Sequence, residues 1–375
     1  MSIATTGTSP TVTDAPGAPE SAAAATTSRV AVTRARHLGW WTLAAIVAVS
    51  VSLLIGVLVG PVHLPLRGAL GELLDHVPFV RIRSGLSATE RNVLVNFRLP
   101  RIVLGGIVGW MLSSAGAAFQ GTFRNPLADP FLLGSAAGAG LGATLIIVYV
   151  HSAGHWFIDP VPLAAFVGAL AAVFAAYALG AAADRRHSAT AILLAGVAVG
   201  SFFTAIQTYV QQRHADVLRQ VYSFILGRLN VSGWSQVRLV VPYVAVASLV
   251  LLLARRHLDV LRVGDEEASA VGMNVRRVRL VVVAAASLGT AAVVAVSGMI
   301  GFVGIIVPHA VRLASGASYR RVVPLSMAFG AAFLILADVV ARTVQAPAEV
   351  PIGVVTAFFG APFFLVILRT RRGLR

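Results

Sequence analysis

Two arginines that flank a proline are the residues whose types and spacing most clearly suggest binding chemistry. Arg98 and Arg101 lie on either side of Pro100, directly before a long apolar run. Proline fits the first turn of a helix because the N–H that it lacks would have no partner there, so we expect both guanidinium groups at the mouth of a helix. There they could form paired, charge-assisted hydrogen bonds with carboxylates of another protein. They could equally anchor the helix by reaching toward lipid headgroups, and the residues alone leave both uses open.

A third arginine, Arg342, lies four residues after Asp338. This spacing places the two side chains on one face of a helix, where they can neutralise each other. A carboxylate within a membrane span needs such a partner, because burying a lone charge is costly. Arginine has more donors than this local pair uses, so the pair leaves Arg342 able to make a further contact.

A polar segment at residues 264–275 has high helical propensity and contains three consecutive acids. Gly272 and Asn274 are typical of a helix C-terminus, so we expect a short helix that ends there. Taken alone, an acidic helical loop is common and does not identify a function. The residues that matter below are Gly264, Asp265, Glu266, Glu267, Ala268 and Gly272.

A tight turn is predicted between two apolar runs, built on Asn125, Pro126, Asp129 and Pro130. Each proline biases the residue before it away from the helical conformation. Asp129 can then cap the next helix, with Pro130 at its first position. This structural role is a sufficient explanation of the motif, and we expect no binding site here.

Missing residue types exclude several kinds of chemistry. The sequence has no cysteine, which excludes disulfides, thiolate metal sites and cysteine nucleophiles. It has no lysine, so it lacks a Walker A loop, and any ATPase must be a separate protein. No metalloprotease motif or pair of membrane aspartates is present, so we expect no enzyme.

A proton relay or metal role for His309 is conceivable, but a lone histidine after a proline is more often a packing residue, and we expect no metal or other cofactor in this chain.

The composition is that of an integral membrane protein. Of the 375 residues, 57% are hydrophobic and 12% are charged, and the mean hydropathy is +0.82. Residues 1–37 are expected to form a disordered cytoplasmic tail, because their first part is rich in Ala, Thr, Ser, Pro and Gly and has no periodic apolar face. Residues 38–375 are expected to form one all-α, polytopic domain.

Hydropathy divides this domain into about ten spans, or nine if the short eighth run does not cross. They lie near residues 38–60, 98–119, 129–150, 161–183, 188–211, 237–255, 279–297, 300–314, 323–341 and 349–369. Glycines recur at every fourth position at 134, 138 and 142, a pattern that lets helices approach closely in lipid, and similar glycines occur at 298, 301 and 304.

Arginine placement predicts the orientation of the spans, because basic residues near span ends are retained in the cytoplasm. With both termini cytoplasmic, most arginine-rich loops fall inside the cell. Residues 61–101 are the exception, since this external loop is also basic. Its charge could attract an acidic partner or could simply be solvated. The arginines follow span ends and form no single soluble face, so we expect no nucleic acid partner.

Several of these motifs resemble the FecCD-type permeases, the membrane subunits of ATP-driven importers for ferric siderophores, haem and cobalamin. The resemblance is carried by the stretch from Arg98 to Gly142, by GMIGFVGIIVPHAVR at 298–312 and by EVPIGVVTAFFGAPFF at 349–364. It extends from about Arg98 to Leu368. Residues 217–234 resemble an external gating segment, although Ser223-Phe224-Ile225 stand where the family usually has a tryptophan.

The resemblance implies an ABC type II importer permease fold and a set of partners. Arg98, Arg101 and Arg342 would meet glutamates of an extracytoplasmic binding protein, and Glu266, Ala268 and Gly272 fit the coupling helix that contacts the ATPase. A second permease copy, identical or a close paralogue, and two ATPase subunits that carry ATP and Mg would complete the importer in the cytoplasmic membrane. The expected cargo is a ferric siderophore, with cobalamin or haem as alternatives. A secondary carrier, the alternative of another class, would need ionisable relays within its spans, where Asp338 is almost the only acid.

Overall fold

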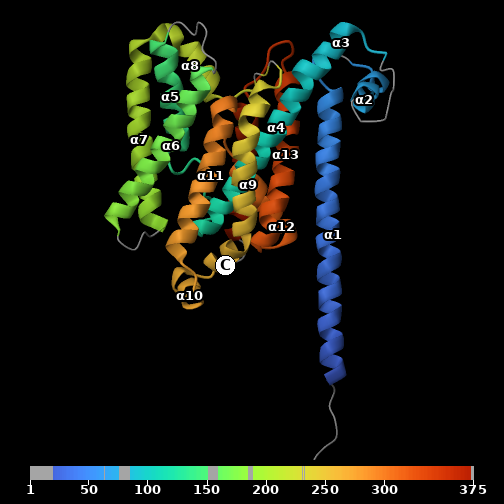
Figure 1. Cartoon of the computed structure of the whole chain (residues 1–375), viewed down its shortest axis with the longest axis vertical. Coiled ribbons are helices and arrows are strands. Elements are labelled where there is room, and N and C mark those ends of the chain that lie inside the picture. The colour runs from blue at the N-terminus through green and yellow to red at the C-terminus, as the bar shows by residue number, and fades with distance from the viewer. Residues whose placement is uncertain are drawn as a thin grey trace, which may run out of the picture. The chain divides into compact units, whose positions relative to one another are not determined.

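The computed structural model describes residues 20–62, 64–75, 85–150, 159–184, 189–229, 231 and 233–372; within these ranges, side chains are described from residue 39 onward except at 73, 364 and 366–372. These residues form helices and no strand (Figure 1). The chain comprises two compact units, residues 1–44 and 45–375, and α1 (Glu20–Leu58) contributes to both. Because α1 begins at Glu20, residues 20–37 of the predicted tail are helical, and the remainder of that tail lies outside the described residues.

Seven stretches of described helix are long and apolar enough to cross a membrane, judged by length and composition. Three further apolar helices are shorter: Ser135–Tyr149, Val303–Ser315 and the stretch Ile352–Phe363. The all-helical membrane fold is therefore confirmed, and the count of about ten spans stays a prediction. The longer helices of the second unit are α4 (Leu99–Thr122), α5 (Ser135–Tyr149), α6 (Pro160–Ala183), α7 (Ala189–Arg213), α9 (Ser235–Leu261), α11 (Val275–Ser297), α12 (Val303–Ser315), α13 (Tyr319–Thr343) and α14 (Ile352–Arg372). The shorter helices are α2 (Leu66–Asp75), α3 (Ala88–Asn92) and η1 (Val93–Arg98) before α4, η2 (Ala215–Val217) and α8 (Leu218–Ile225) between α7 and α9, and α10 (Asp265–Ala270) between α9 and α11.

The helix that contains Pro100 starts earlier than predicted. A continuous helical stretch runs from Ala88 to Thr122, so Pro100 lies within it and does not open it. Proline cannot donate a backbone hydrogen bond, and its ring crowds the carbonyl four residues before it. The helix accommodates this proline by widening to the π-helical turn η1 over Val93–Arg98. The freed carbonyl of Asn96 accepts a hydrogen bond of 2.8 Å from the Gly233 N–H.

Backbones touch directly where α4 crosses its neighbours. A methyl group added at Gly116 would overlap the carbonyl of Gly304, and one added at Gly109 would overlap that of Gly330. The predicted ridge on α5 is confirmed at Gly138, where a methyl group would overlap the carbonyl of Gly168 on α6. The same does not hold for Gly301, which faces open space.

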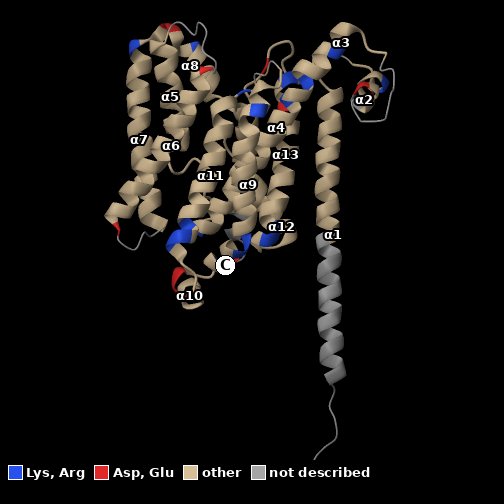
Figure 2. Ribbon diagram, in the orientation of Figure 1, with Lys and Arg blue, Asp and Glu red and all other residues tan. Residues whose placement is uncertain are grey.

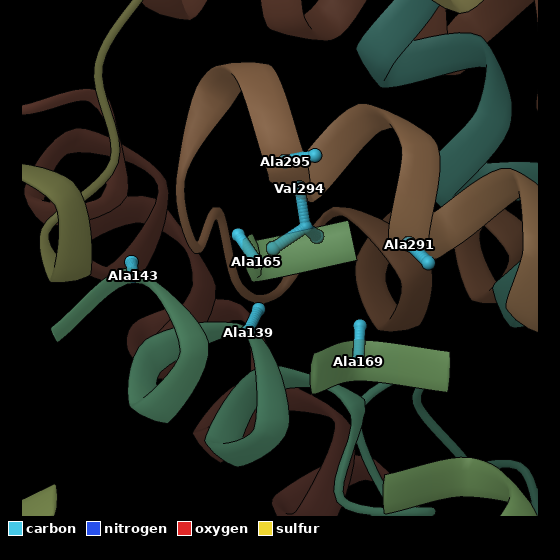
Figure 3. Packing of buried hydrophobic residues seen from close by; sticks show 7 residues of the cluster. All are labelled: Ala139, Ala143, Ala165, Ala169, Ala291, Val294 and Ala295. Carbon is cyan, nitrogen blue, oxygen red and sulfur yellow. The ribbon is translucent and has the colours of Figure 1, made fainter. Parts of the chain in front are cut away.

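A seam of small residues joins α5 and α6 to α11. Its buried members are Ala139, Ala143, Ala165, Ala169, Ala291, Val294 and Ala295. Figure 3 shows the three residues of α11 opposite the alanines of the other two helices. Six of the seven buried side chains are single methyl groups, and larger side chains such as Phe166, Leu170 and Met299 pack against them.

Charged residues of the second unit gather near the two ends of its helices (Figure 2). One end, called here the α10 end, joins Arg124 and Arg279 to Asp265 and Arg262 to the Ala317 carbonyl. The other, called the α3 end, carries the arginine cluster described below. The sequence predicted that most arginine-rich loops share one side, and the residues of the α10 end belong to those loops. The assignment of the α10 end to the cytoplasm stays a prediction.

Candidate functional site

Arg98 and Arg342 close the C-terminal end of α1. The last carbonyls of a helix lack partners within it and carry partial negative charge, so they attract cationic donors. Arg98 donates to the carbonyls of Val57 and Val62 at 2.8 and 2.6 Å, and Arg342 donates to that of Gly56 at 2.7 Å. Arg98 is 4% exposed and Arg342 is 3% exposed. Both guanidinium groups are therefore committed to the interior of the chain.

Arg101 lies between two carboxylates from distant parts of the sequence. Its Nε donates to Asp338 on α13 at 2.9 Å, and its terminal nitrogens donate to Glu349 at 2.6 and 3.1 Å. The Asp338 side chain is 2% exposed and also faces Arg342 at 3.5 Å, which is the predicted pair on one helix face. A buried carboxylate shared by two arginines is compensated on both sides.

This arrangement corrects the expected presentation of the docking arginines. Arg98 and Arg342 offer no guanidinium group to an outside protein, because both bind the chain's own carbonyls. The Arg101 side chain is 16% exposed and Glu349 is 46% exposed, so these two form the accessible part of the cluster. The sequence reasoning missed Glu349, although this residue opens the EVPIGVVTAFFGAPFF stretch that carries part of the resemblance.

The segment predicted to gate the external mouth is attached by hydrogen bonds to η1, α11 and α14. Besides the Gly233 bond to η1, the indole of Trp234 donates to the Val95 carbonyl at 3.1 Å. The Arg228 N–H donates to the carbonyl of Ser297, at the end of α11, at 2.8 Å. The first residues of α14, Ile352 and Gly353, donate to Gly227 and Leu226 at 3.1 Å each. Any movement of this segment must therefore involve η1, α11 or α14.

The predicted coupling segment forms α10, whose N-cap is Gly264. Asp265 accepts two hydrogen bonds from Arg279 at 3.0 and 2.9 Å and lies 3.6 Å from Arg124. Ala268 is buried beneath the helix, whereas the side chains of Glu266, Glu267 and Val271 are exposed. The helix is thus pinned on one side and open to a partner on the other.

The end of α10 differs from the prediction in one residue. Gly272 adopts a φ of +82°, and its N–H donates to the Ser269 carbonyl at 2.9 Å, as expected for a glycine that follows a helix. Asn274 belongs to the next helix, because its side chain accepts from the Arg277 N–H at 3.0 Å and caps the start of α11.

The side chains of the proline-rich segment form hydrogen bonds within their own turn and do not cap the next helix. The Asn125 side chain accepts from the Leu127 N–H at 3.0 Å, and Asp129 accepts from the Phe131 N–H at 2.8 Å. The helix that follows begins at Ser135, after Gly134 in the left-handed conformation, so neither Asp129 nor Pro130 lies at its start. Desolvation raises the pKa of the Asp129 carboxyl to about 6, and the hydrogen bond from Phe131 opposes that rise. Pro126 lies beside Asn125 in the same turn.

His309 is a buried packing residue that meets the ring of Phe363 edge-on, with 6.3 Å between ring centres. Among the described residues, no group of three or more His, Cys, Asp or Glu side chains could hold a metal ion.

A groove of about 1060 Å³ lies along α5 and α7. Its lining combines small residues of α5 with a polar strip of α7, and Ile225 and Met299 border it. The polar residues are Ser201, Thr204, Gln207, Thr208, Tyr209, Gln211 and Gln212. Sequence reasoning expected substrate contacts on this span without naming residues, although the spacing of Thr204, Thr208 and Gln211 on one helical face was a usable signal.

A model of the FecCD transport family matches residues 46–370. The chain belongs to the FecCD transport family. It is 38% identical over 368 residues to the cobalamin import system permease protein BtuC of Halobacterium salinarum, across 90% of this chain and 97% of that protein. It is also 38% identical over 291 residues to the hemin transport system permease protein HmuU of Yersinia pestis, across 75% of this chain and 84% of the relative.

A solved structure of a metal-chelate type ABC transporter in an inward-facing conformation has the same fold, with a TM-score of 0.74 and 27% identity. The match covers 88% of this chain and 98% of that one. These findings confirm the predicted FecCD membership and the importer-permease fold. They also extend the likeness upstream of Arg98, because the family model already matches from residue 46.

Proposed function

We propose that this FecCD family member is the membrane-spanning permease subunit of an ATP-driven importer for a metal chelate. The observation that carries the proposal is the family match over residues 46–370, together with near full-length relatives named as import permeases. The chain itself makes and breaks no covalent bond. It provides a path, and the energy comes from a separate ATPase.

The exposed face of α10 is the proposed contact for that ATPase. Glu266, Glu267 and Val271 project from a helix that Asp265 fixes to Arg279 and Arg124. A push on α10 would pass through the Arg124 contact to the turn before α5, whose residues Phe131 and Leu132 border the groove. Two ATPase subunits with ATP and Mg, one for each of two permease copies, complete the proposed importer. The α10 end and both termini then face the cytoplasm.

The α3 end is the proposed docking face for an extracytoplasmic binding protein. Of the three predicted docking arginines, Arg101 is the one whose side chain reaches the surface, where it forms an ion pair with Glu349. A carboxylate of the binding protein would replace Glu349 as the partner of this guanidinium group. Arg98 and Arg342 would support docking indirectly, by holding the end of α1 in place.

A ferric siderophore is the cargo expected from the sequence, with cobalamin and haem as alternatives within the same function. A carrier that works without ATP is not favoured. It would need a titratable group free to bind and release protons, and Asp338 is held between Arg101 and Arg342.

The test is uptake by vesicles that contain the permease, its ATPase and its binding protein. Chelate should accumulate with ATP and Mg, and should not accumulate without the ATPase subunit or with a non-hydrolysable nucleotide. Equal uptake in vesicles that lack the ATPase would contradict the proposal. In the same vesicles, Arg101→Gln should weaken the stimulation by binding protein, whereas Arg238→Gln, the same loss of charge at an exposed residue in the first turn of α9, should change it little.

A further inference from the structure

We infer that a second groove, lined by α1, α4, α9 and α13, holds an acyl chain of an anionic phospholipid whose phosphate binds Arg238. This groove is called here the apolar groove. The inference concerns the lipid and not the cargo, so it goes beyond the proposed function and does not depend on it. It requires only that the helices cross a bilayer, as their length and composition and the family match indicate.

The apolar groove has a volume of about 380 Å³. α1 contributes Val49 and Leu53 to its lining, and α9 contributes Val241 and Ala245. Leu53 is 38% exposed and Val241 is 44% exposed, so the groove is open on its outer side. The bilayer core contains no water that could fill it, and hydrocarbon chains must therefore cover these side chains.

The polar groups of the lining are paired with each other. Among the described residues that line the apolar groove, the polar side chains are those of Trp110 and Ser248. The Trp110 indole N–H donates to the Ser248 hydroxyl at 2.9 Å, so it is not available to a ligand. A polar molecule would lose its hydration here and gain little in return, whereas a hydrocarbon chain needs no hydrogen bonds.

Arg238 supplies a charged group at one end of the groove. Val241 and Ala245 follow it at three and seven residues, so all three lie on one face of α9. Arg238 is exposed, and its guanidinium group forms no hydrogen bond or ion pair with any residue that the structure describes. Arg101, which precedes the lining residue Ile102, is by contrast held by two carboxylates. A guanidinium group binds phosphate through paired, charge-assisted hydrogen bonds, so Arg238 suits a phospholipid headgroup.

The length of the apolar groove matches one leaflet of a bilayer. Ser248 lies ten residues after Arg238, or about 15 Å along the helix. This is half of a hydrocarbon core about 30 Å thick, so Ser248 lies near the middle of the bilayer when Arg238 lies at its surface. The start of α9 belongs to the α3 end, because Trp234 beside it donates to the Val95 carbonyl of η1. The lipid therefore belongs to the leaflet at the α3 end.

Trp110 makes the site measurable, because bromine atoms on an acyl chain quench the fluorescence of an indole that they touch. The full-length chain is placed in bilayer discs of phosphatidylcholine, and brominated phosphatidylglycerol or brominated phosphatidylcholine is added. The Trp110 signal is the difference in fluorescence between the unchanged chain and Trp110→Phe. Phosphatidylglycerol should quench it at an about fivefold lower mole fraction, because one arginine near the surface favours an anionic headgroup by about that factor.

Two results of this experiment would overturn the inference. Equal quenching by the two brominated lipids would show ordinary contact with the bilayer and no headgroup site. Absence of quenching by both would show that protein covers the groove, such as a second copy of the chain.

Arg238→Gln tests the charged end. It should remove the preference for phosphatidylglycerol, whereas Arg219→Gln, the same change at an exposed residue of α8 outside the lining, should retain it. A preference that Arg238→Gln leaves unchanged would contradict the assigned headgroup contact. ATP-driven uptake is measured separately, so failure here leaves the proposed function standing, and Arg238→Gln should alter the lipid preference without altering stimulation by the binding protein.

Ala245→Phe tests the position of the acyl chain. Its ring would fill part of the groove and should remove quenching of Trp110 by both brominated lipids. Val246→Phe introduces the same ring at the next residue of α9, which is 55% exposed and outside the lining, and should retain the quenching. Full quenching in Ala245→Phe would show that the chain lies elsewhere. If Ala245→Phe is not recovered as a folded protein, the comparison of Arg238→Gln with Arg219→Gln still decides.

Discussion

At the scale of single residues, the arginines of the α3 end divide into two kinds. Arg98 and Arg342 satisfy carbonyls at the end of α1, and Arg101 balances Asp338 and Glu349. All three occupy places that sequence patterns associate with a partner outside the chain. Their surroundings differ because Arg98 and Arg342 lie next to the end of α1 and Arg101 does not. This proximity depends on how the helices pack, and no local sequence pattern encodes it.

Asp338 should be the most sensitive residue of this cluster. Asp338→Asn removes a buried charge that Arg101 and the buried Arg342 share, and we expect a loss of about 3–5 kcal/mol in the free energy of unfolding. The measurement is the unfolding transition of the purified chain in detergent, followed by tryptophan fluorescence.

Glu349→Gln is the matched control, because it removes a carboxylate from the same arginine at a site that is 46% exposed. It should cost at most about 1 kcal/mol, as for other solvent-screened pairs. Equal losses in the two variants would show that Asp338 is not the shared counter-ion described above.

At the scale of helices, hydropathy predicted the apolar runs well and their ends less well. The helix expected to begin near Arg98 starts at Ala88, because η1 absorbs Pro100 and Gly233, far along the chain, binds a freed carbonyl. Local propensity predicted a turn at Asn125 to Pro130, and both Asn125 and Asp129 accept backbone hydrogen bonds there. The start of α5 was predicted wrongly, because Asp129 bonds within this turn and the helix begins only at Ser135.

Contacts between helices give a sharp test at this scale. Gly116→Ala would place a methyl group on the carbonyl of Gly304, and the crossing of α4 and α12 cannot widen without disturbing other glycine contacts of α4. We expect a loss of about 1–3 kcal/mol or failure to assemble, measured as the fraction of chain recovered as a monodisperse species and as its unfolding transition.

The control is Gly301→Ala, the same substitution at a glycine with nothing within 4 Å. It should be recovered in normal yield and unfold near the transition of the unchanged chain. A similar defect in both variants would contradict the close approach at Gly116.

At the scale of the whole molecule, the sequence identified a membrane protein, its two kinds of helix ends and its family. Composition and arginine placement are properties of the whole chain, so the predictions made from them do not depend on the exact boundaries of single helices. The groove was not predicted, since its lining comes from α5 and α7, with borders from α8 and the segment before α12, and only their packing brings these together.

The orientation can be measured directly because the chain has no cysteine. Val344 after α13 is 71% exposed and Val271 after α10 is 73% exposed. In right-side-out vesicles, a membrane-impermeant maleimide should label the single variant Val344→Cys, and should label Val271→Cys only after permeabilisation. The opposite pattern would place the α10 end outside and would remove the proposed contact with the ATPase.

The alanine seam between α11 and the pair α5 and α6 has a mechanical consequence. Interlocking side chains resist sliding, whereas methyl groups on both faces leave few steps for one helix to climb over another. The glycine crossings of α4 with α12 and α13, and of α5 with α6, join backbones and make each group stiff. Contacts of this kind are the ones along which packed helices shift by small sliding in shear motions, although the larger Phe166 and Leu170 of α6 also pack against this seam.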